Sequence, residues 1–326
     1  LSQQKNDLKL LNELIERQKK MQVSDLYYID KIYWIIEDCK KFGTLPFAGL
    51  ARCGFIATEI LNSFVEEKIL TKNEKLKFLS TINTITSEMN KDLNKSKKFF
   101  LNKYGHLRPG TYEITSENYK SNFSNYFGKK RKFKNISQNK FEFSYTQKNK
   151  INKLKSKNKI YKDFSELINF IKNSIKYREY SKFIFTKSVD MIFDNLERLG
   201  KKFRIDKKEL SYLDIQKILN LYFNYSNYKS IESLKLNIQE NKKEYYKNYL
   251  INLPDVITSG KDLFLQKKNE SKINFISNKI ITSKLFEFSK INLKNKINGI
   301  ICIENADPGY DFLFSKNIKG LITKYG

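Results

Sequence analysis

Apolar residues recur at the three- and four-residue spacing of an amphipathic helix through most of the chain up to about residue 250. This spacing places them on one helical face, which has to be buried against other helices. Three segments also open with the capping-box pattern, in which a Ser, Thr or Asp is followed three residues later by Glu. These are Thr71–Glu74, Asp163–Glu166 and Asp206–Glu209. The chain is therefore predicted to be mainly α.

The expected helices can be bounded by these caps and by the breaker residues between the apolar stripes. We expect helices over 1–40, from about Ala51 to Val65, from Thr71 to Leu93, from about Lys95 to Tyr104, from Asp163 to Gly200, from Asp206 to Phe223, and over 231–250. The glycine and proline within Phe42–Pro46 predict a turn or loop between the first two.

The helical pattern ends at Leu253-Pro254-Asp255, and β-branched runs follow. Strands are expected over Ile273–Ile276, Lys279–Thr282, Gly299–Glu304 and Gly320–Thr323, with a short helix over Pro308–Phe314. A strand, a short helix and a strand in succession indicate an α/β unit. We therefore divide the chain into a helical domain, 1–262, and the start of a small α/β domain, 263–326. Because the chain opens on Leu1 and stops just after a strand-like run, we expect it to be part of a longer protein.

The formal charge of +27 arises from 62 basic and 35 acidic residues. Of the basic residues 55 are Lys and 7 are Arg, and this skew disfavours specific nucleic-acid recognition, for which arginine is the usual side chain. The basic residues are dense over 128–160, where the only acid is Glu142. We interpret that segment as a long connector with a short extended piece, and a nucleic-acid arm is the alternative.

Cysteines and apolar runs suggest neither a metal site nor a membrane anchor. Cys39, Cys53 and Cys302 lack the paired spacing of zinc ligands, and no second histidine accompanies them. No apolar run approaches 18 residues. We expect no bound metal, no membrane and a cytoplasmic location with reduced thiols.

The stretch Tyr104–Tyr112 contains the only histidine, His106, together with Arg108 and a Pro109-Gly110 pair. Proline followed by glycine suits the centre of a type II turn, which would hold both side chains at a rigid corner. An arginine fork binds carboxylate or phosphate, and an imidazole donates a hydrogen bond or moves a proton near neutral pH. The alternative is a loop histidine whose hydrogen bonds are satisfied internally.

Three further cations are candidate site residues. Arg52 is expected near the start of its helix, where the helix dipole disfavours a cation, so it is a candidate for function. Arg178 and Lys182 are four residues apart and share a helical face, with Glu179 beside them. In each case an ordinary solvated side chain or ion pair is the alternative.

Ile301–Tyr310 and Lys319–Gly326 resemble the swivelling phosphohistidine domain of the superfamily that includes phosphoenolpyruvate synthase, pyruvate phosphate dikinase and rifampicin phosphotransferase. In that domain the last strand leads into a glycine pair and then a Ser-His, whose histidine carries the phosphoryl group. Gly326 matches the first glycine, so the resemblance places the catalytic histidine beyond this chain.

Four other segments resemble the central domain of a bacterial branch of this superfamily, the branch of the L-glutamine kinases of capsular phosphoramidate synthesis. They are Phe47–Arg52, Tyr104–Ile114, Arg178–Thr186 and Leu210–Ile215. The resemblance implies that ATP and Mg²⁺ are bound by an upstream ATP-grasp domain. It also implies that the phosphohistidine swings to an acceptor on the helical domain, with AMP and phosphate released. The acceptor would be the side-chain amide of L-glutamine, or else pyruvate or a rifamycin hydroxyl.

The resemblance and the residue types together suggest roles. Binding of the acceptor and the moving phosphoryl group is expected of Arg52, Arg108, Tyr112, Arg178 and Lys182, and the catalytic base is expected to be His106 or Glu179. This chain alone is expected to turn over no ATP. A non-enzymatic, basic nucleic-acid-binding module is the remaining alternative.

Overall fold

The computed structural model describes residues 2–128, 140–159, 163–223, 229–251, 253, 257–263, 275–276, 279–293, 297–316 and 318–325. The described chain is mainly helical and carries one small parallel sheet near its C-terminal end, which confirms the mainly α fold class. The helices are α1 (Ser2–Val23), α2 (Tyr28–Asp38), the π-helix η1 (Cys39–Thr44), α3 (Leu45–Glu66), α4 (Lys72–Ser80), α5 (Ile85–Asp92), α6 (Lys97–Tyr104), α7 (Phe123–Phe127), α8 (Tyr145–Lys157), α9 (Phe164–Phe203), α10 (Lys207–Leu210), α11 (Ile215–Phe223), α12 (Lys229–Asn248) and the 3-10 helices η2 (Gly260–Leu263), η3 (Phe288–Lys290) and η4 (Pro308–Lys316).

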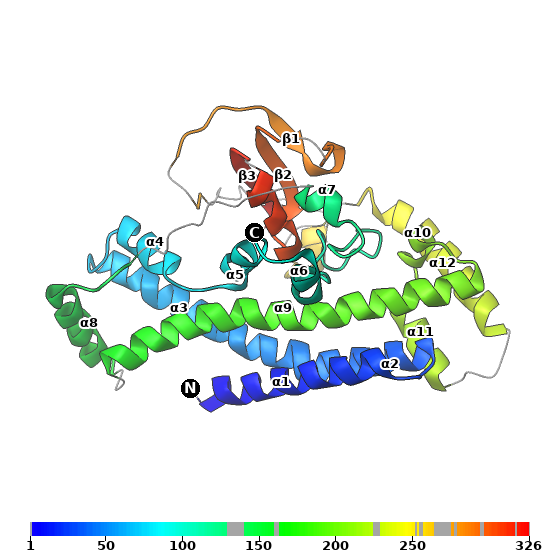
Figure 1. Ribbon diagram of the computed structural model, residues 1–326, viewed down its shortest axis with the longest axis horizontal. Helices are drawn as coiled ribbons and strands as arrows, with labels where there is room; N and C mark the ends of the chain where they lie inside the picture. The colour runs from blue at the N-terminus through cyan, green and yellow to red at the C-terminus, as the bar shows by residue number, and fades with distance from the viewer. Residues whose placement is uncertain are drawn as a thin grey trace.

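Helix α9 is the central element of the fold. It has 40 residues and crosses the whole molecule, with α1, α2 and α3 packed along it (Figure 1). The Asp163 side chain accepts a hydrogen bond from the Glu166 backbone and begins the helix, and Arg204 in the left-handed region ends it. The sheet and the short helices α5, α6 and α7 lie over the middle of α9, whereas α4 and α8 lie at one end and α10 to α12 at the other (Figure 1).

The predicted loop at Phe42–Pro46 is wrong. The chain stays helical from Tyr28 to Glu66, with the π-helix η1 inserted between α2 and α3. Pro46 falls in the first turn of α3, directly after the π-helix, where its fixed φ suits the start of an α-helix. Gly43 is needed for packing, because a Cβ there would lie 2.9 Å from the Cβ of Phe185 on α9.

Three predicted helices are each split in two, so their continuous forms are also wrong. The first ends at Val23 and restarts at Tyr28. The second breaks between α4 and α5, where Thr84 provides a fresh cap by accepting from the Ser87 backbone. The third ends after the four residues of α10, although its Asp206–Glu209 capping box is present. At such points Ser, Thr, Asn or Asp side chains can bond to nearby backbone groups, and these bonds replace the hydrogen bonds that would continue the helix.

The basic connector predicted over 128–160 also differs from the structure. Residues 129–139 lie outside the described part, but α8 is a 13-residue helix that begins with a Ser144–Gln147 capping box. Its buried Ile151 packs in a cluster with Phe78 and Leu167, and Phe143 contacts the rings of Phe78 and Phe164. The loop interpretation of this part is therefore wrong, because a few apolar residues are enough to dock a lysine-rich helix.

The sheet has the order β1-β2-β3 and is parallel throughout, with β1 at Leu285–Glu287, β2 at Ile300–Asn305 and β3 at Gly320–Tyr325. The predicted succession of β2, η4 and β3 is confirmed. The strand predicted over 279–282 is wrong, because those residues form no regular element. Of the strand predicted over 273–276, the first two residues lie outside the described part, and Phe275 and Ile276 are irregular.

The sheet shares one core with the helices. Ile301, Ile303 and Phe312 are buried in the same cluster as Tyr104 and Tyr119. The centre of the Phe312 ring lies 4.7 Å from that of Tyr126 on α7. The domain division at residue 262 stays a prediction, but the C-terminal unit is packed onto the helical body in this arrangement.

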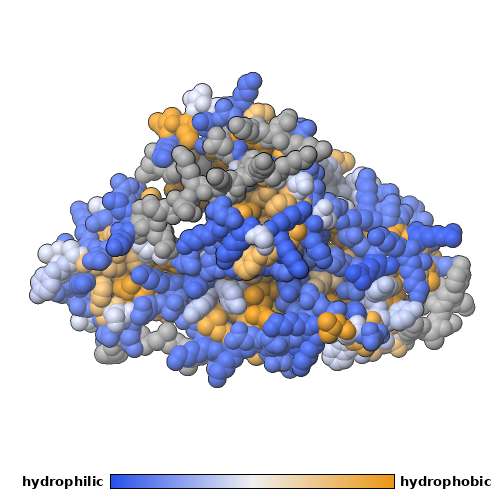
Figure 2. All heavy atoms as spheres, viewed as in Figure 1, coloured by the Kyte–Doolittle hydropathy of each residue, from blue (hydrophilic) through white to orange (hydrophobic). Residues whose placement is uncertain are grey.

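One helical run in the described part, Tyr28–Glu66, is long and apolar enough by composition to cross a membrane. Residues of this run pack against α9, and a core helix of a water-soluble protein passes the same test. The visible face of the molecule is mostly hydrophilic, with apolar side chains in small groups (Figure 2). These features are compatible with a soluble protein.

Candidate functional site

The stretch Tyr104–Tyr112 forms a tight corner between α6 and the segment before α7. Gly110 has φ +63°, the left-handed conformation expected of the glycine in the predicted turn. Backbone hydrogen bonds from Tyr119 N–H to the Leu107 carbonyl (2.8 Å) and from Lys120 N–H to the Gly105 carbonyl (3.0 Å) fix the corner. The positive φ at Gly110 is the one the predicted turn requires, and the rigidity of the corner stays a prediction.

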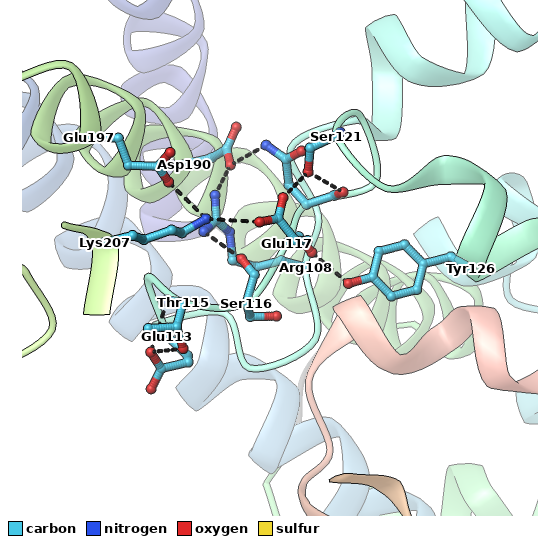
Figure 3. Close-up of polar contacts among 11 residues, drawn as sticks. Arg108, Glu113, Thr115, Ser116, Glu117, Ser121, Tyr126, Asp190, Glu197 and Lys207 are labelled. Atoms are coloured by element: carbon cyan, nitrogen blue, oxygen red, sulfur yellow. Dashed lines mark hydrogen bonds and ion pairs between the residues drawn. The ribbon is translucent and has the colours of Figure 1, made fainter. Parts of the chain in front are cut away.

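Arg108 is buried and held within the protein (Figure 3). Its Nη1 donates to the Ser116 carbonyl at 3.0 Å, and its Nη2 is paired with the Asp190 carboxylate on α9. The Asn118 amide also donates to Asp190, at 2.9 Å. The guanidinium lies 4.9 Å from the centre of the Phe193 ring. The arginine fork thus already binds a carboxylate, but that carboxylate belongs to α9.

His106 also contacts α9. Its Nε2 lies 3.1 Å from the Phe183 carbonyl, and because a carbonyl only accepts, the proton is placed on Nε2. Burial lowers the pKa of His106 to about 3, against the opposing effect of this hydrogen bond, and the nearby Lys187 and Arg108 lower it further. The imidazole is neutral at physiological pH and is a weak base there.

Lys182 on α9 and the backbone of Thr111 meet at one carboxylate. Lys182 Nζ lies 3.3 Å from Asp307 Oδ1, and the Thr111 N–H donates to Asp307 Oδ2 at 3.3 Å. Asp307 belongs to the loop between β2 and η4, which is far from both donors in the sequence. The side chains of Lys182 and Asp307 are 26% and 12% exposed, so the pair is partly screened from water.

The same loop makes two closer contacts with the helical body. The Tyr119 hydroxyl donates to the Gly309 carbonyl at 2.8 Å, and both residues are buried. A Cβ on Gly309 would fall 1.6 Å from the Arg108 carbonyl oxygen, so the two backbones touch directly. Only a glycine fits this contact without a shift of one backbone. Sequence reasoning missed Asp307, Gly309 and Tyr119 as site residues, although the Asp-Pro-Gly loop after a predicted strand was a signal for a docking turn.

Asp311, one turn into η4, completes the junction. The Thr86 hydroxyl on α5 donates to Asp311 Oδ2 at 2.7 Å. Burial raises the pKa of Asp311 to about 6; the Thr86 hydrogen bond and Lys182 oppose the shift, and the charge of Glu179 adds to it. Glu179 and Lys182 are therefore both close enough to act on this carboxyl group.

The structure brings some predicted site residues together and not others. Lys182 and Glu179 lie at the junction, and Tyr112, although 65% exposed, is near enough for Asp307 to add to the raising of its pKa by partial burial. Arg178 lies one helical turn from Lys182, and its guanidinium is 5.2 Å from the centre of the Phe55 ring on α3. Arg52 is exposed on α3. It lies beyond the first turn of that helix, so the predicted clash with the helix dipole is wrong.

A pocket of about 480 Å³ lies elsewhere, where the end of α3 meets α4 and α8. Its walls include Lys68, Thr71, Glu74, Ser144 and Gln147. Two capping boxes use the polar groups of this wall, and Gln147 donates to Glu74 at 3.0 Å. The pocket is lined by none of the candidate site residues that the sequence predicts. We therefore place the candidate site at the β2–η4 junction, where Lys182 and Glu179 lie.

Comparison with protein-family models and with curated proteins finds no match to this chain. Among the described residues, no three His, Cys, Asp or Glu side chains converge as a metal site requires.

The depressed pKa of His106 predicts a pH dependence of stability. A histidine that is neutral in the folded protein takes up a proton on unfolding, so its contribution is complete above pH 6.5 and falls as the pH drops towards 3. Between pH 6.5 and 5 the loss is about 2 kcal/mol. Replacement of His106 by Gln, which keeps a donor for the Phe183 carbonyl, should remove this loss.

The measurement is the free energy of unfolding of wild type and His106→Gln by urea denaturation at both pH values. The comparison between variants is essential, because Asp311 acts in the opposite direction: its raised pKa makes the folded protein gain stability as the pH falls from 6 towards 3.8. An identical pH response in the two proteins would contradict the buried, neutral histidine.

Proposed function

We propose that this chain is the acceptor-binding part of an ATP-dependent phosphotransferase that works through a phosphohistidine, with the side-chain amide of L-glutamine as the acceptor. One observation supports this proposal above the others. The two stretches that most resemble the phosphohistidine superfamily, Tyr104–Ile114 and Ile301–Tyr325, are far apart in the sequence and lie in direct contact at Arg108 and Gly309. A split site of this kind is what transfer between a donor unit and a helical acceptor unit requires.

The side chains at the junction suit phosphoryl transfer to an amide. Lys182 at the junction would neutralise the charge of the moving group, with Arg178 one helical turn away on α9. The bond from phosphorus to the donor histidine breaks, a bond from phosphorus to the amide nitrogen forms, and the amide proton passes to Glu179. We favour Glu179 over His106 as the base, since His106 has a pKa of about 3 and its Nε2–H faces the Phe183 carbonyl.

ATP and Mg²⁺ would be bound by an upstream ATP-grasp domain. They would supply the phosphoryl group to the donor histidine, in a cytoplasmic enzyme that releases AMP and phosphate. The residues of this chain would bind the acceptor and the phosphoryl group.

The test is acceptor-dependent AMP release by the longer protein that carries the ATP-binding and phosphohistidine segments. With L-glutamine, we expect AMP and a product whose phosphorus NMR signal is that of a phosphorus–nitrogen bond. Lys182→Met should lower this rate about 100-fold or more, as loss of a charge-stabilising group does. Lys201→Met, at an exposed position on the same helix, is the matched control and should be near wild type.

The alternatives give different products. A phosphate ester formed from pyruvate or a rifamycin, without any glutamine product, would replace the amide as acceptor. The role of this site would be contradicted if AMP were released at the same rate with and without each acceptor. It would also be contradicted if Lys182→Met were as active as Lys201→Met.

A further inference from the structure

The contact between Asp307 and the helical body joins a carboxylate to two donors that come from separate elements. Its Oδ1 faces Lys182 Nζ on α9, and its Oδ2 faces the backbone N–H of Thr111, each at 3.3 Å. Both donors therefore meet the same side chain, that of Asp307. An ammonium group and a backbone N–H that converge on two oxygens of one anion form an oxyanion site.

The surroundings give this site a fixed shape. Thr111 is buried and follows the Gly110 turn, so its N–H direction is set by the backbone. Arg108 lies nearby but is already neutralised by Asp190 and cannot serve an incoming anion without leaving that partner. Glu179 and Asp311 add negative charge near Lys182. The balance of charge at the donors therefore depends on whether Asp307 is in place.

We propose that Lys182 and the Thr111 N–H form a binding site for a phosphate-type dianion, and that Asp307 is its internal occupant, which holds the β2–η4 loop on the helical body until the dianion displaces it. This inference rests on the proposed function in so far as Lys182 serves phosphoryl transfer. It adds the second donor and the residue that regulates access.

Competition explains how Asp307 would act. An internal group that fills a site competes with an external ligand. The apparent affinity of the ligand is the intrinsic affinity multiplied by the fraction of molecules in which the site is open. The Lys182–Asp307 pair is partly exposed, and such pairs are weak enough to be displaced. Two further contacts keep the carboxylate in position: Thr86 with Asp311 at 2.7 Å and Tyr119 with the Gly309 carbonyl at 2.8 Å.

The experiment is calorimetric titration of this chain with inorganic phosphate at pH 7.5 and a fixed ionic strength, which limits non-specific attraction to a chain of charge +27. Asp307→Asn should bind phosphate about fivefold more tightly than wild type. Glu287→Gln is the matched control, because it removes the same charge and the same kind of contact, with Lys290, from an exposed position on the C-terminal unit. It should bind phosphate as wild type does.

A further variant, Thr86→Val, tests the proposal if Asp307→Asn folds poorly. Thr86→Val leaves Lys182, Thr111 and Asp307 intact but loosens the loop, so phosphate affinity should rise about threefold. Addition of Lys182→Met to either variant should abolish the gain. Equal phosphate affinity in wild type, Asp307→Asn and Thr86→Val would overturn the proposal, as would a gain that survives Lys182→Met. Phosphate binding needs neither ATP nor glutamine, so this result is independent of whether the proposed function holds.

Discussion

Replacement of Arg108 by Met is expected to lower the free energy of unfolding by about 3–5 kcal/mol, which is the usual cost of removing one partner from a buried ion pair. The Asp190 carboxylate would stay behind with a side chain only 12% exposed, and it would keep the hydrogen bond from the Asn118 amide but lose its charged partner. The Ser116 carbonyl would also lose its donor. The quantity to measure is the urea midpoint, monitored by circular dichroism.

Arg17→Met provides the comparison for this prediction. Arg17 pairs with Glu13 and Asp38 but is 40% exposed, so its loss should cost less than about 1 kcal/mol. The double variant Arg108→Met with Asp190→Asn should recover part of the stability, since no buried charge is left unpaired. An Arg108→Met protein within about 1 kcal/mol of wild type would mean that Arg108 does not hold the corner in place.

Replacement of Gly309 by Ala is expected to cost about 3 kcal/mol, the upper part of the usual range for overpacking. The new methyl group would lie 1.6 Å from the Arg108 carbonyl oxygen, and neither backbone can move away without cost. Retreat of the β2–η4 loop would break the Tyr119 contact with the Gly309 carbonyl and pull Phe312 from its place among Tyr119, Tyr126 and Phe127. Hydrogen exchange at the amides of β2 and η4 should become faster together with the global loss of stability.

Gly320→Ala tests whether this cost is specific to the contact. Gly320 begins β3 in the same unit, and a Cβ there would meet its nearest neighbour, a side-chain carbon of Ile300, at 3.4 Å. We expect a change below about 1 kcal/mol. If the two alanine variants are equally stable, the loop does not rest on Arg108 as described.

The helix starts were predictable because their signals are local. Thr71 and Asp206 carry complete capping boxes, and Asp163 caps α9 as expected. The π-helix at Cys39–Thr44 was not predictable, because the fit of Gly43 against Phe185 depends on a helix more than 100 residues away. Likewise, Ser144 and Gln147 form a capping box among lysines, and what makes α8 stable is the burial of its Ile151 in the cluster that contains Phe78 and Leu167.

The candidate site was only partly accessible to sequence reasoning. The turn at Pro109-Gly110 and the shared face of Arg178 and Lys182 follow from short-range rules. The partners of His106 and Arg108 on α9 do not, since no local pattern pairs a loop with Phe183 or Asp190. The meeting of Asp307 with Lys182 and Thr111 depends on how the C-terminal unit packs, which composition and periodicity do not specify.

Helix α9 has a mechanical consequence for this junction. It contacts the Tyr104–Tyr112 corner at Phe183 and Asp190 and the β2–η4 loop at Lys182, and these three residues span about 12 Å of its axis at 1.5 Å per residue. Because a helix is stiff along its length, the relative positions and orientations of these three residues are fixed. Any sliding of the helix that disturbed Asp190, the partner of Arg108, would also move the Lys182 ammonium group that pairs with Asp307. The position of Lys182 at Asp307 is thus tied to the buried pair of Arg108 and Asp190 on the same helix.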